Sequence, residues 1–167
     1  MARKGFNHPF ATLMSNASNE PLRFDGTFHM AVDAKRRVQF PSEWRPTDGS
    51  PLRVTLLPWP KSEKRGAFIS ICPQSVMDEL QAKVKAMKYS DEKAQALRRL
   101  ISGRSAVVTT DAQGRILLPE HLAAEAGIGT QATFVGSTDR WELWSRERYN
   151  QTQAADQALE REAYDLI

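Results

Sequence analysis

The chain has 167 residues, 41% of them hydrophobic, and its 23 Lys and Arg outnumber its 20 Asp and Glu. This length and apolar share fit one ordinary domain or two small intertwined halves, and the small positive charge permits contact with phosphate without requiring it. No stretch approaches the roughly 20 apolar residues that span a bilayer, and the N-terminus lacks the apolar run of a secretory signal, so we expect a cytoplasmic protein without a membrane partner.

The chain opens with an irregular segment and then a strand–turn–strand pattern. Residues 1–24 mix Asn, Ser, Pro and basic types without sustained periodicity, which predicts a flexible N-terminal arm. Apolar side chains alternate with others over 28–32, as is typical of a strand. A polar turn at Asp33–Arg37 follows, and a second strand ends at Pro41.

The next two segments predict a β-hairpin. Residues 52–57 and 67–72 are rich in β-branched and apolar types, and a Pro/Lys/Gly stretch over 58–66 separates them as a long basic tip. This hairpin completes a first half over 25–73. A single cysteine, Cys72, excludes an intramolecular disulfide and a Cys-rich zinc site, and we interpret it as a small buried apolar residue.

Two amphipathic helices form the predicted connection over 74–103. The first, over 74–88, carries apolar side chains at helical spacing. These are Val76, Leu80, Val84 and Met87. Ser90 is the predicted N-cap of the second helix, whose apolar stripe continues as far as Gly103.

The β pattern then returns in a second half over 104–150. Its predicted elements are a strand at 106–110, a turn at Asp111–Arg115, a strand at 116–119, a short helix at 120–126 ending at Gly127, and strands at 131–136 and 140–144. Residues 145–167 are polar and rich in Ala, Gln and Glu, so they form either a helix or a frayed tail. The C-terminal tail proper is 151–167.

One pattern occurs twice and is the strongest observation in the sequence. Residues 32–41 (VDAKRRVQFP) match residues 110–119 (TDAQGRILLP), and the shared Asp, Ala, Arg and Pro all recur at the same spacing. That spacing is 78 residues, the difference between Asp33 and Asp111. Such an internal repeat indicates that each half supplies the same supersecondary unit and that neither half buries its apolar face alone.

The chemistry of the repeated turn is specific. The Asp at its head accepts hydrogen bonds from backbone N–H groups two or three residues on, and a Gly supplies the positive φ that such turns often need. The residues with these structural roles are Asp33, Pro41, Asp111, Gly114 and Pro119. Each Asp–Arg pair either braces its turn or belongs to a binding surface, and both roles are compatible if only one face of the guanidinium is used.

The doubled pattern resembles the signature of the MraZ family, bacterial regulators of the cell-division and cell-wall gene cluster, whose halves are related to AbrB-like swapped-hairpin DNA-binding domains. The family carries Asp-x-x-Gly-Arg-x-x-x-Pro twice. Here the second copy matches in full, and the first has Arg36 in place of Gly. A non-Gly residue at positive φ costs roughly 1 kcal/mol, so a rebuilt first turn is one expectation. The resemblance covers about residues 25–150.

The resemblance implies an α+β fold with two pseudo-symmetric AbrB-like β halves of the swapped-hairpin barrel type and a central helical hairpin. It also implies a ring-shaped homo-oligomer that binds repeated promoter boxes in double-stranded DNA. The implied DNA-binding residues are Lys35, Arg36, Arg37, Gln113 and Arg115. Contact with phosphate is the safer assignment for each, and recurrence of the basic turn in an oligomer would turn weak contacts into avidity that falls with salt.

Other classes of function have less support in the residues. The three histidines, His8, His29 and His121, have no metal-ligand spacing, and no nucleophile elbow, P-loop or dinucleotide-binding motif occurs. We therefore expect no enzyme, metal or cofactor. The main alternative is an antitoxin-type interaction module whose segment 151–167 occupies a partner, although such antitoxins usually carry one signature per chain. A structural ring whose basic face meets another polyanion is a third hypothesis.

Overall fold

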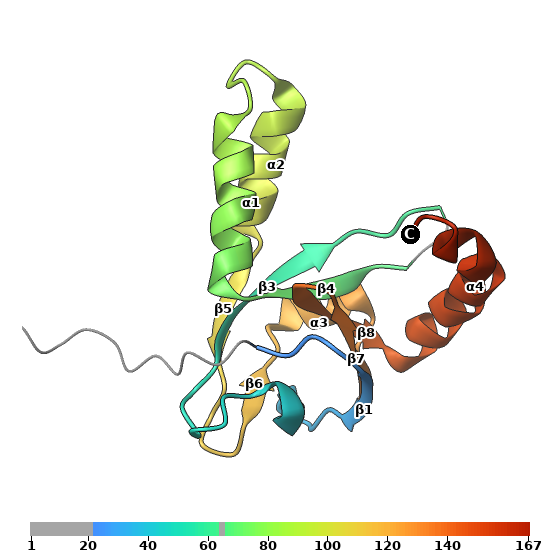
Figure 1. The fold of residues 1–167 in the computed structure, drawn as a ribbon. Helices are drawn as coiled ribbons and strands as arrows, with labels where there is room; N and C mark the ends of the chain where they lie inside the picture. Colours follow the sequence, from blue (N-terminus) through green and yellow to red (C-terminus); the bar gives the residue numbers. More distant parts are fainter. Residues whose placement is uncertain (1–21, 64–65) are drawn as a thin grey trace, which may run out of the picture.

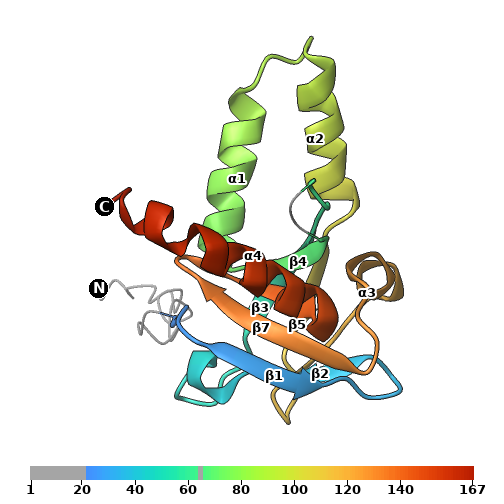
Figure 2. The same cartoon turned by 90° about the vertical axis from the view of Figure 1, so that its right-hand side faces the viewer.

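The computed structural model describes residues 22–63 and 66–167 and has an α+β architecture (Figure 1). In chain order its elements are β1 (Thr27–Ala31), β2 (Arg37–Gln39), the 3-10 helix η1 (Ser42–Trp44), β3 (Arg53–Trp59), β4 (Phe68–Cys72), α1 (Gln74–Ala86), α2 (Glu92–Gly103), β5 (Ala106–Thr109), β6 (Arg115–Leu117), α3 (Glu120–Ala126), β7 (Gln131–Ser137), β8 (Arg140–Ser145) and α4 (Arg146–Tyr164). The strands form the body, the α1–α2 hairpin projects from one end, and α4 projects from another side (Figures 1 and 2).

Strand pairing crosses between the two halves. The larger sheet has the order β1-β7-β8-β4-β3-β5, and its pairs are antiparallel. The predicted hairpin is confirmed as β3–β4, but β3 continues through Trp59, so its tip begins later than residue 58; residues 64–65 of the tip lie outside the described residues. β1 pairs with β7, and β5 pairs with β3. Each half therefore supplies an edge strand to a hairpin of the other.

These cross-half pairs obey the offset of the sequence repeat. Arg53 lies opposite Thr109, and Gln131 lies opposite Ala31. Residue 131 is 53 plus 78, and residue 109 is 31 plus 78, so the offset converts one pair into the other. The same relation holds for two backbone bonds at the strand ends, from Thr110 N–H to the Leu52 carbonyl and from Val32 N–H to the Thr130 carbonyl, both 2.9 Å long.

A second, two-stranded sheet lies at the centre of the repeat. β2 and β6 pair antiparallel, and their middle pair joins Val38 to Ile116, residues that are themselves 78 positions apart. Both side chains are buried, with 1% and 0% of their surface exposed. The two signature copies therefore meet along this ribbon.

The core packs aromatic rings from both halves against each other. Phe40 and Trp44 come from the first half, Phe134 and Trp141 from the second, and all four are buried. The Phe40 ring meets Trp141 and Phe134 edge to face, with ring centroids 5.2 and 5.4 Å apart. Such pairs contribute about 0.5–1.5 kcal/mol each beyond burial. The two halves therefore share one main hydrophobic core.

The body begins before residue 25. The indole Nε1 of Trp141 donates to the carbonyl of Arg23, and that of Trp44 donates to the carbonyl of Asp25, both at 2.8 Å. The Phe24 ring lies 4.7 Å from that of Trp141. These bonds satisfy indole donors that burial would otherwise leave unpaired. Residues 22–24, expected in the arm, thus pack on the core, while residues 1–21 lie outside the described part.

The helical connection is confirmed as α1 and α2, with corrections where the helices meet. Asp91, and not Ser90, is the N-cap of α2, since its carboxylate accepts the N–H groups of Lys93 at 2.9 Å and Ala94 at 3.4 Å. A carboxylate suits this position because the helix N-terminus carries partial positive charge. Met87, predicted in the apolar stripe, follows the end of α1 and is 41% exposed.

A smaller apolar cluster joins this hairpin to the sheet. Its buried members are Leu57, Cys72, Val76, Met77, Val84 and Ile101. Cys72 has no exposed surface, and burial raises the pKa of its thiol. The interpretation of Cys72 as a buried apolar residue is therefore confirmed.

The polar segment after β8 is a helix, α4, and not a frayed tail. The Ser145 hydroxyl caps it by accepting the N–H of Arg148 at 3.2 Å. The guanidinium of Arg148 donates to the carbonyls of Glu125 at 2.9 Å and Ala67 at 3.4 Å, which ties the first turn of α4 to α3 and to the β3–β4 hairpin. Of the helices in the described chain, none is long and apolar enough to cross a membrane.

We expect Ile116→Ala to lower the free energy of unfolding by about 2–4 kcal/mol, because it opens a cavity where the two halves meet. Leu117→Ala is the matched control on the same strand, since Leu117 is 54% exposed and surface substitutions usually stay within about 0.5 kcal/mol. Urea denaturation at one fixed protein concentration measures both. Equal losses would contradict the burial of Ile116 at the shared centre.

Candidate functional site

The first signature turn is organised by one carboxylate. Asp33 Oδ1 accepts the backbone N–H groups of Lys35 at 2.9 Å and Arg37 at 2.8 Å, and its Oδ2 accepts Nε of Arg37 at 2.7 Å. The backbone closes the turn through the N–H of Arg36, which donates to the Asp33 carbonyl at 2.9 Å. Asp33 therefore holds both the loop and the side chain of Arg37.

The second turn repeats this arrangement. Asp111 Oδ1 accepts the N–H groups of Gln113 at 3.0 Å and Arg115 at 2.9 Å, and its Oδ2 accepts Nε of Arg115 at 2.9 Å. Gly114 N–H donates to the Asp111 carbonyl at 2.8 Å. The bracing ion pair, one of the two roles considered for each Asp–Arg pair, is thus present in both turns.

These bonds lower the pKa of both carboxyl groups below their ordinary value of 3.8. The largest cause is the backbone N–H of the arginine, Arg37 for Asp33 and Arg115 for Asp111. Desolvation opposes this effect, while the arginine side chain adds to it because hydrogen bonds to a carboxylate favour its ionised form. Both aspartates are therefore ionised at neutral pH and keep their arginines in place.

Bracing uses only one edge of each guanidinium. Arg37 pairs through Nε, and among the described residues its terminal nitrogens have no hydrogen-bond partner. Arg115 pairs through Nε as well, and one of its terminal nitrogens lies 3.3 Å from the Gln113 side-chain oxygen. Terminal amino groups on a planar guanidinium can bind an anion from outside. The geometry therefore permits bracing and ligand binding by the same arginine.

The two arginines share one face of the β2–β6 ribbon. The ribbon pairs are Arg37–Leu117, Val38–Ile116 and Gln39–Arg115. The middle pair points into the core, so the alternation of a strand puts the outer pairs on the opposite face. Arg37 and Arg115 are offset by two residues along the ribbon, about 7 Å. The outer face of the ribbon thus presents two braced arginines together with Gln39 and the exposed Leu117.

Arg36 keeps the backbone conformation of the glycine that it replaces. Its φ is 61°, and that of Gly114 is 77°. The expectation of a rebuilt first turn is therefore wrong, and the strain of roughly 1–2 kcal/mol is accepted. Two bonds to the second half accompany it, because Arg36 Nε donates to the Leu118 carbonyl at 3.2 Å and Leu118 N–H donates to the Arg36 carbonyl at 2.9 Å.

A further cation, Arg45, lies at the second turn and was not predicted. A Cβ placed on Gly114 would overlap Nη1 of Arg45, so the Arg45 guanidinium occupies the space that a side chain at position 114 would enter. In the first turn the side chain of Arg36 starts from the equivalent position. Both turns therefore contain a second guanidinium. Arg45 falls outside the repeat, so comparison of the two signature copies could not single it out.

The environment of Arg45 sets it apart from a solvated surface arginine. Its Nε is buried and has no hydrogen-bond partner among the described residues. Arg45 also lines, with Arg23 and Asp111, a hollow of about 700 Å³ beside the second turn. Buried unpaired donors are costly, so Arg45 has unused capacity to bind an acceptor.

The remaining candidates have structural surroundings. His29 Nδ1 lies 2.9 Å from Thr133 Oγ1, His121 is exposed on α3, and His8 lies outside the described residues. Within residues 22–63 and 66–167, no three His, Cys, Asp or Glu side chains gather as a metal site would require. Pro41 and Pro119 precede η1 and α3, as residues that end a strand and start a helix.

Comparisons with known proteins identify the family of this chain. The chain matches the model of the MraZ protein family, whose description adds the term antitoxin-like, over residues 102–165. It is 32% identical over 139 residues to the transcriptional regulator MraZ of Caulobacter vibrioides, covering 83% of this chain and 87% of the relative. The MraZ regulator of Carboxydothermus hydrogenoformans is 31% identical over 148 residues, covering 86% and 99%.

The fold, the doubled turn and these relatives define the class as a transcriptional regulator, which is not an enzyme. More narrowly, the chain belongs to the MraZ family, as the doubled signature indicated.

Asp33 and Asp111 should titrate below pH 3.8 when their side-chain carboxyl carbons are followed by NMR. Since the folded-state pKa is lowered, ionisation of these groups stabilises the fold above about pH 3.8, and that contribution disappears as the pH falls through the lowered pKa. Arg115→Ala should move the Asp111 midpoint upward and leave Asp33 unchanged. An unshifted Asp111 in this variant would show that the guanidinium contributes nothing.

Gly114→Ala should destabilise the protein by at least about 1 kcal/mol, because alanine is strained at positive φ and its Cβ would displace Arg45. Adding Arg45→Ala should recover part of this loss, since the overlap disappears while the strain persists. Thermal unfolding of both single variants and the double variant gives the interaction free energy between positions 45 and 114. Strict additivity would mean that Arg45 does not lie against Gly114.

Proposed function

We propose that the protein binds double-stranded DNA sequence-specifically, as a transcriptional regulator, through the outer face of the β2–β6 ribbon and its two signature turns. The observation that carries the proposal is the pair of arginines, Arg37 and Arg115, each held by an aspartate through Nε with terminal nitrogens left over. Preorganised side chains lose little entropy on binding, and the fork geometry of arginine matches phosphate or guanine.

The dimensions of the ribbon support this mode of binding. A two-stranded antiparallel ribbon fits the major groove of B-DNA, which is about 12 Å wide, and side chains on its outer face can reach base edges. Arg37, Gln39 and Arg115 lie on that face, while Lys35, Arg36 and Gln113 lie in the adjoining turns. We assign the turn cations and Arg45 to phosphate contacts, and Arg37 and Arg115 to the positions closest to the bases.

The repeated organisation of the chain suggests how affinity is built. Strand exchange and the 78-residue offset support two pseudo-symmetric AbrB-like halves of the swapped-hairpin type. We infer that such chains assemble into a ring-shaped homo-oligomer that binds repeated promoter boxes, as in the regulation of a cell-division and cell-wall gene cluster. In a ring the basic turns recur, so weak contacts add through effective concentration. This function places the protein in the cytoplasm, at the nucleoid.

A second candidate is an antitoxin-type interaction module. The description of the matching family and the projecting α4 favour it. Two braced signature turns in one chain favour DNA instead, because an interaction module would need only one β unit to hold its partner-binding tail. Binding of specific DNA by the isolated protein decides between the two.

Replacing Arg37 and Arg115 together by Ala should abolish discrimination between promoter DNA and a scrambled duplex, measured by fluorescence anisotropy over a range of salt concentrations. Because these two arginines are assigned to the bases, the slope of log affinity against log salt should change by less than the roughly 0.9 expected for each lost phosphate contact. The fold should persist, because the carboxylates still accept the backbone N–H groups of their turns.

The matched control is Lys93→Ala with Arg146→Ala, which removes the same charge from the α2 start and the α4 start. These positions lie away from the ribbon, so this variant should keep its preference for promoter DNA. An equal loss of DNA affinity in both double variants would mean that the protein binds DNA only through its overall positive charge. Unfolding of the arginine variant alone would show that these residues serve chiefly as turn braces.

A further inference from the structure

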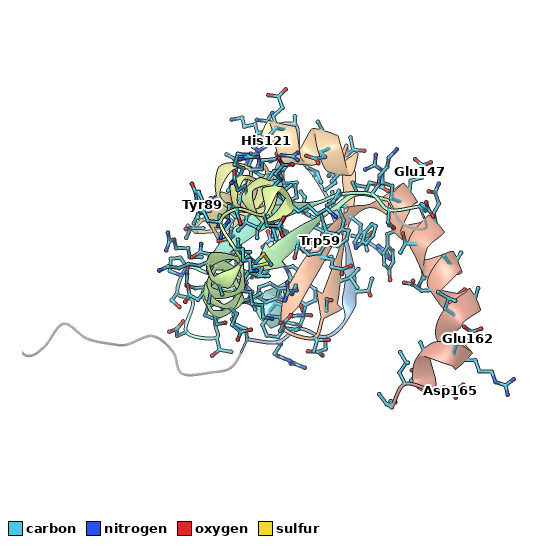
Figure 3. The ribbon with its side chains drawn as sticks, turned by 90° about the horizontal axis from the view of Figure 1, so that it is seen from above. Trp59, Tyr89, His121, Glu147, Glu162 and Asp165 are labelled. Atoms are coloured by element: carbon cyan, nitrogen blue, oxygen red, sulfur yellow. The ribbon has the colours of Figure 1, made fainter. Side chains whose placement is uncertain are left out.

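The free part of α4 is an amphipathic helix with an uncovered apolar stripe. At 3.6 residues per turn, one face collects small and apolar side chains. These are Thr152, Ala155, Leu159 and Ala163, and Leu166 follows shortly after the helix ends at Tyr164. Leu159 and Leu166 are 49% and 85% exposed, and every residue from 153 to 167 is exposed. Figure 3 shows Glu162 and Asp165 at the far end of this helix, well away from the body.

Acidic residues border that stripe on both sides. Asp156 and Glu160 lie along one edge and Glu162 along the other, while Arg161 falls on the opposite face. Residues 151–167 contain four acidic residues and one basic residue, a net charge of −3. Because the whole chain has a net charge of +3, the other residues together carry +6. Short helices without tertiary contacts are marginal in water. The stripe and its acidic borders therefore call for a partner surface that is apolar along its centre and basic along its rim.

The α1–α2 hairpin provides such a surface. A hollow of about 280 Å³ lies between the two helices, and its lining residues are Gln81, Val84, Lys85, Arg98, Ile101 and Ser102. Val84 and Ile101 are buried apolar residues at its base, while Lys85 and Arg98 are cations at its rim. Arg99 and Arg104 extend the positive charge along α2. The groove is thus apolar at its base and positively charged at its rim, which complements the negatively charged borders of the α4 stripe.

Arg98 gives this groove an unused donor. One terminal nitrogen, Nη2, donates to the carbonyls of Val84 at 3.1 Å and Met87 at 2.7 Å, at the end of α1. The other, Nη1, is buried and has no hydrogen-bond partner among the described residues. A carboxylate brought into the groove would satisfy it.

The same chain does not bring the two surfaces together. Arg148 fixes the first turn of α4 against α3 and the β3–β4 hairpin, and α4 leaves the body on a different side from α1 and α2 (Figures 1 and 3). The lengths nevertheless match, since the 12 residues of α4 from 153 to 164 span about 18 Å, the same as the 12 residues of α2. A third helix from another molecule would complete a three-helix arrangement.

We propose that residues 152–167 of one copy dock into the α1–α2 groove of a second copy. The stripe then fills the hollow whose base Val84 and Ile101 form, and the acidic borders face Lys85, Arg98 and Arg99. This contact is heterologous, because it joins two different surfaces, and heterologous contacts close into rings when the rotation permits. The inference rests on the proposed self-association and names the surfaces that carry it.

The first test uses the full-length protein without DNA, so that its outcome is independent of promoter binding. Leu159→Glu with Ala163→Glu places two charges on the stripe and should weaken assembly about tenfold or more, measured by analytical ultracentrifugation over a concentration series. Ala154→Glu with Gln157→Glu adds two charges on the other side of α4 and should leave the assembly mass unchanged. Both pairs lie in the projecting part of α4, so the body should stay folded.

The second test exchanges charges. Asp156→Lys with Glu160→Lys should weaken self-assembly, and so should Lys85→Glu with Arg99→Glu. An equimolar mixture of these two variants should recover assembly, because each supplies the surface that the other needs. Arg98 stays intact because it also caps α1. Wild-type protein that is monomeric at all concentrations, stripe variants that assemble normally, or a mixture that fails to recover would each overturn the proposal.

Discussion

The exchange of strands between the two halves is the constraint on which the rest of the structure depends. β1 pairs with β7 and β5 pairs with β3, so each half completes its sheet with a strand of the other. Because apolar surface is shared in this way, the aromatic rings Phe40, Trp44, Phe134 and Trp141 pack as one cluster. Disruption at the central Val38–Ile116 pair would therefore affect both halves together.

The same exchange builds the candidate site. It lays β2 against β6, and thereby places one signature turn at each end of a single short ribbon. Within each turn an ionised aspartate orients an arginine, while bonds between Arg36 and Leu118 lock one half to the other. Arg45 is another contact between the halves, since this residue of the first half fills the space above Gly114 of the second. The site is thus a property of the pair of halves.

Two elements, the α1–α2 hairpin and α4, project from this shared centre (Figure 1). The α1–α2 hairpin contacts the sheet only near its base, and α4 is held through Arg148 and its first turns. Acidic residues border the exposed stripe of α4, whereas Lys85 and Arg98 border the hollow between α1 and α2. The β2–β6 ribbon with its braced arginines therefore lies apart from these two projecting elements, so substitutions in one region leave the contacts of the other in place.

Residue periodicity and turn chemistry determined much of this protein in advance, because they act over short distances. The β3–β4 hairpin, both long helices of the connection, α3 with Gly127 at its end, and the Asp–Arg turns all follow from local patterns, and the doubled signature led to the family. Tertiary structure decided the rest: which strands pair, that Arg36 stays at positive φ, and that residues 22–24 join the core. It also placed Arg45 beside Gly114, since contacts between residues so far apart in the chain depend on how the halves interlock and leave no local pattern to read.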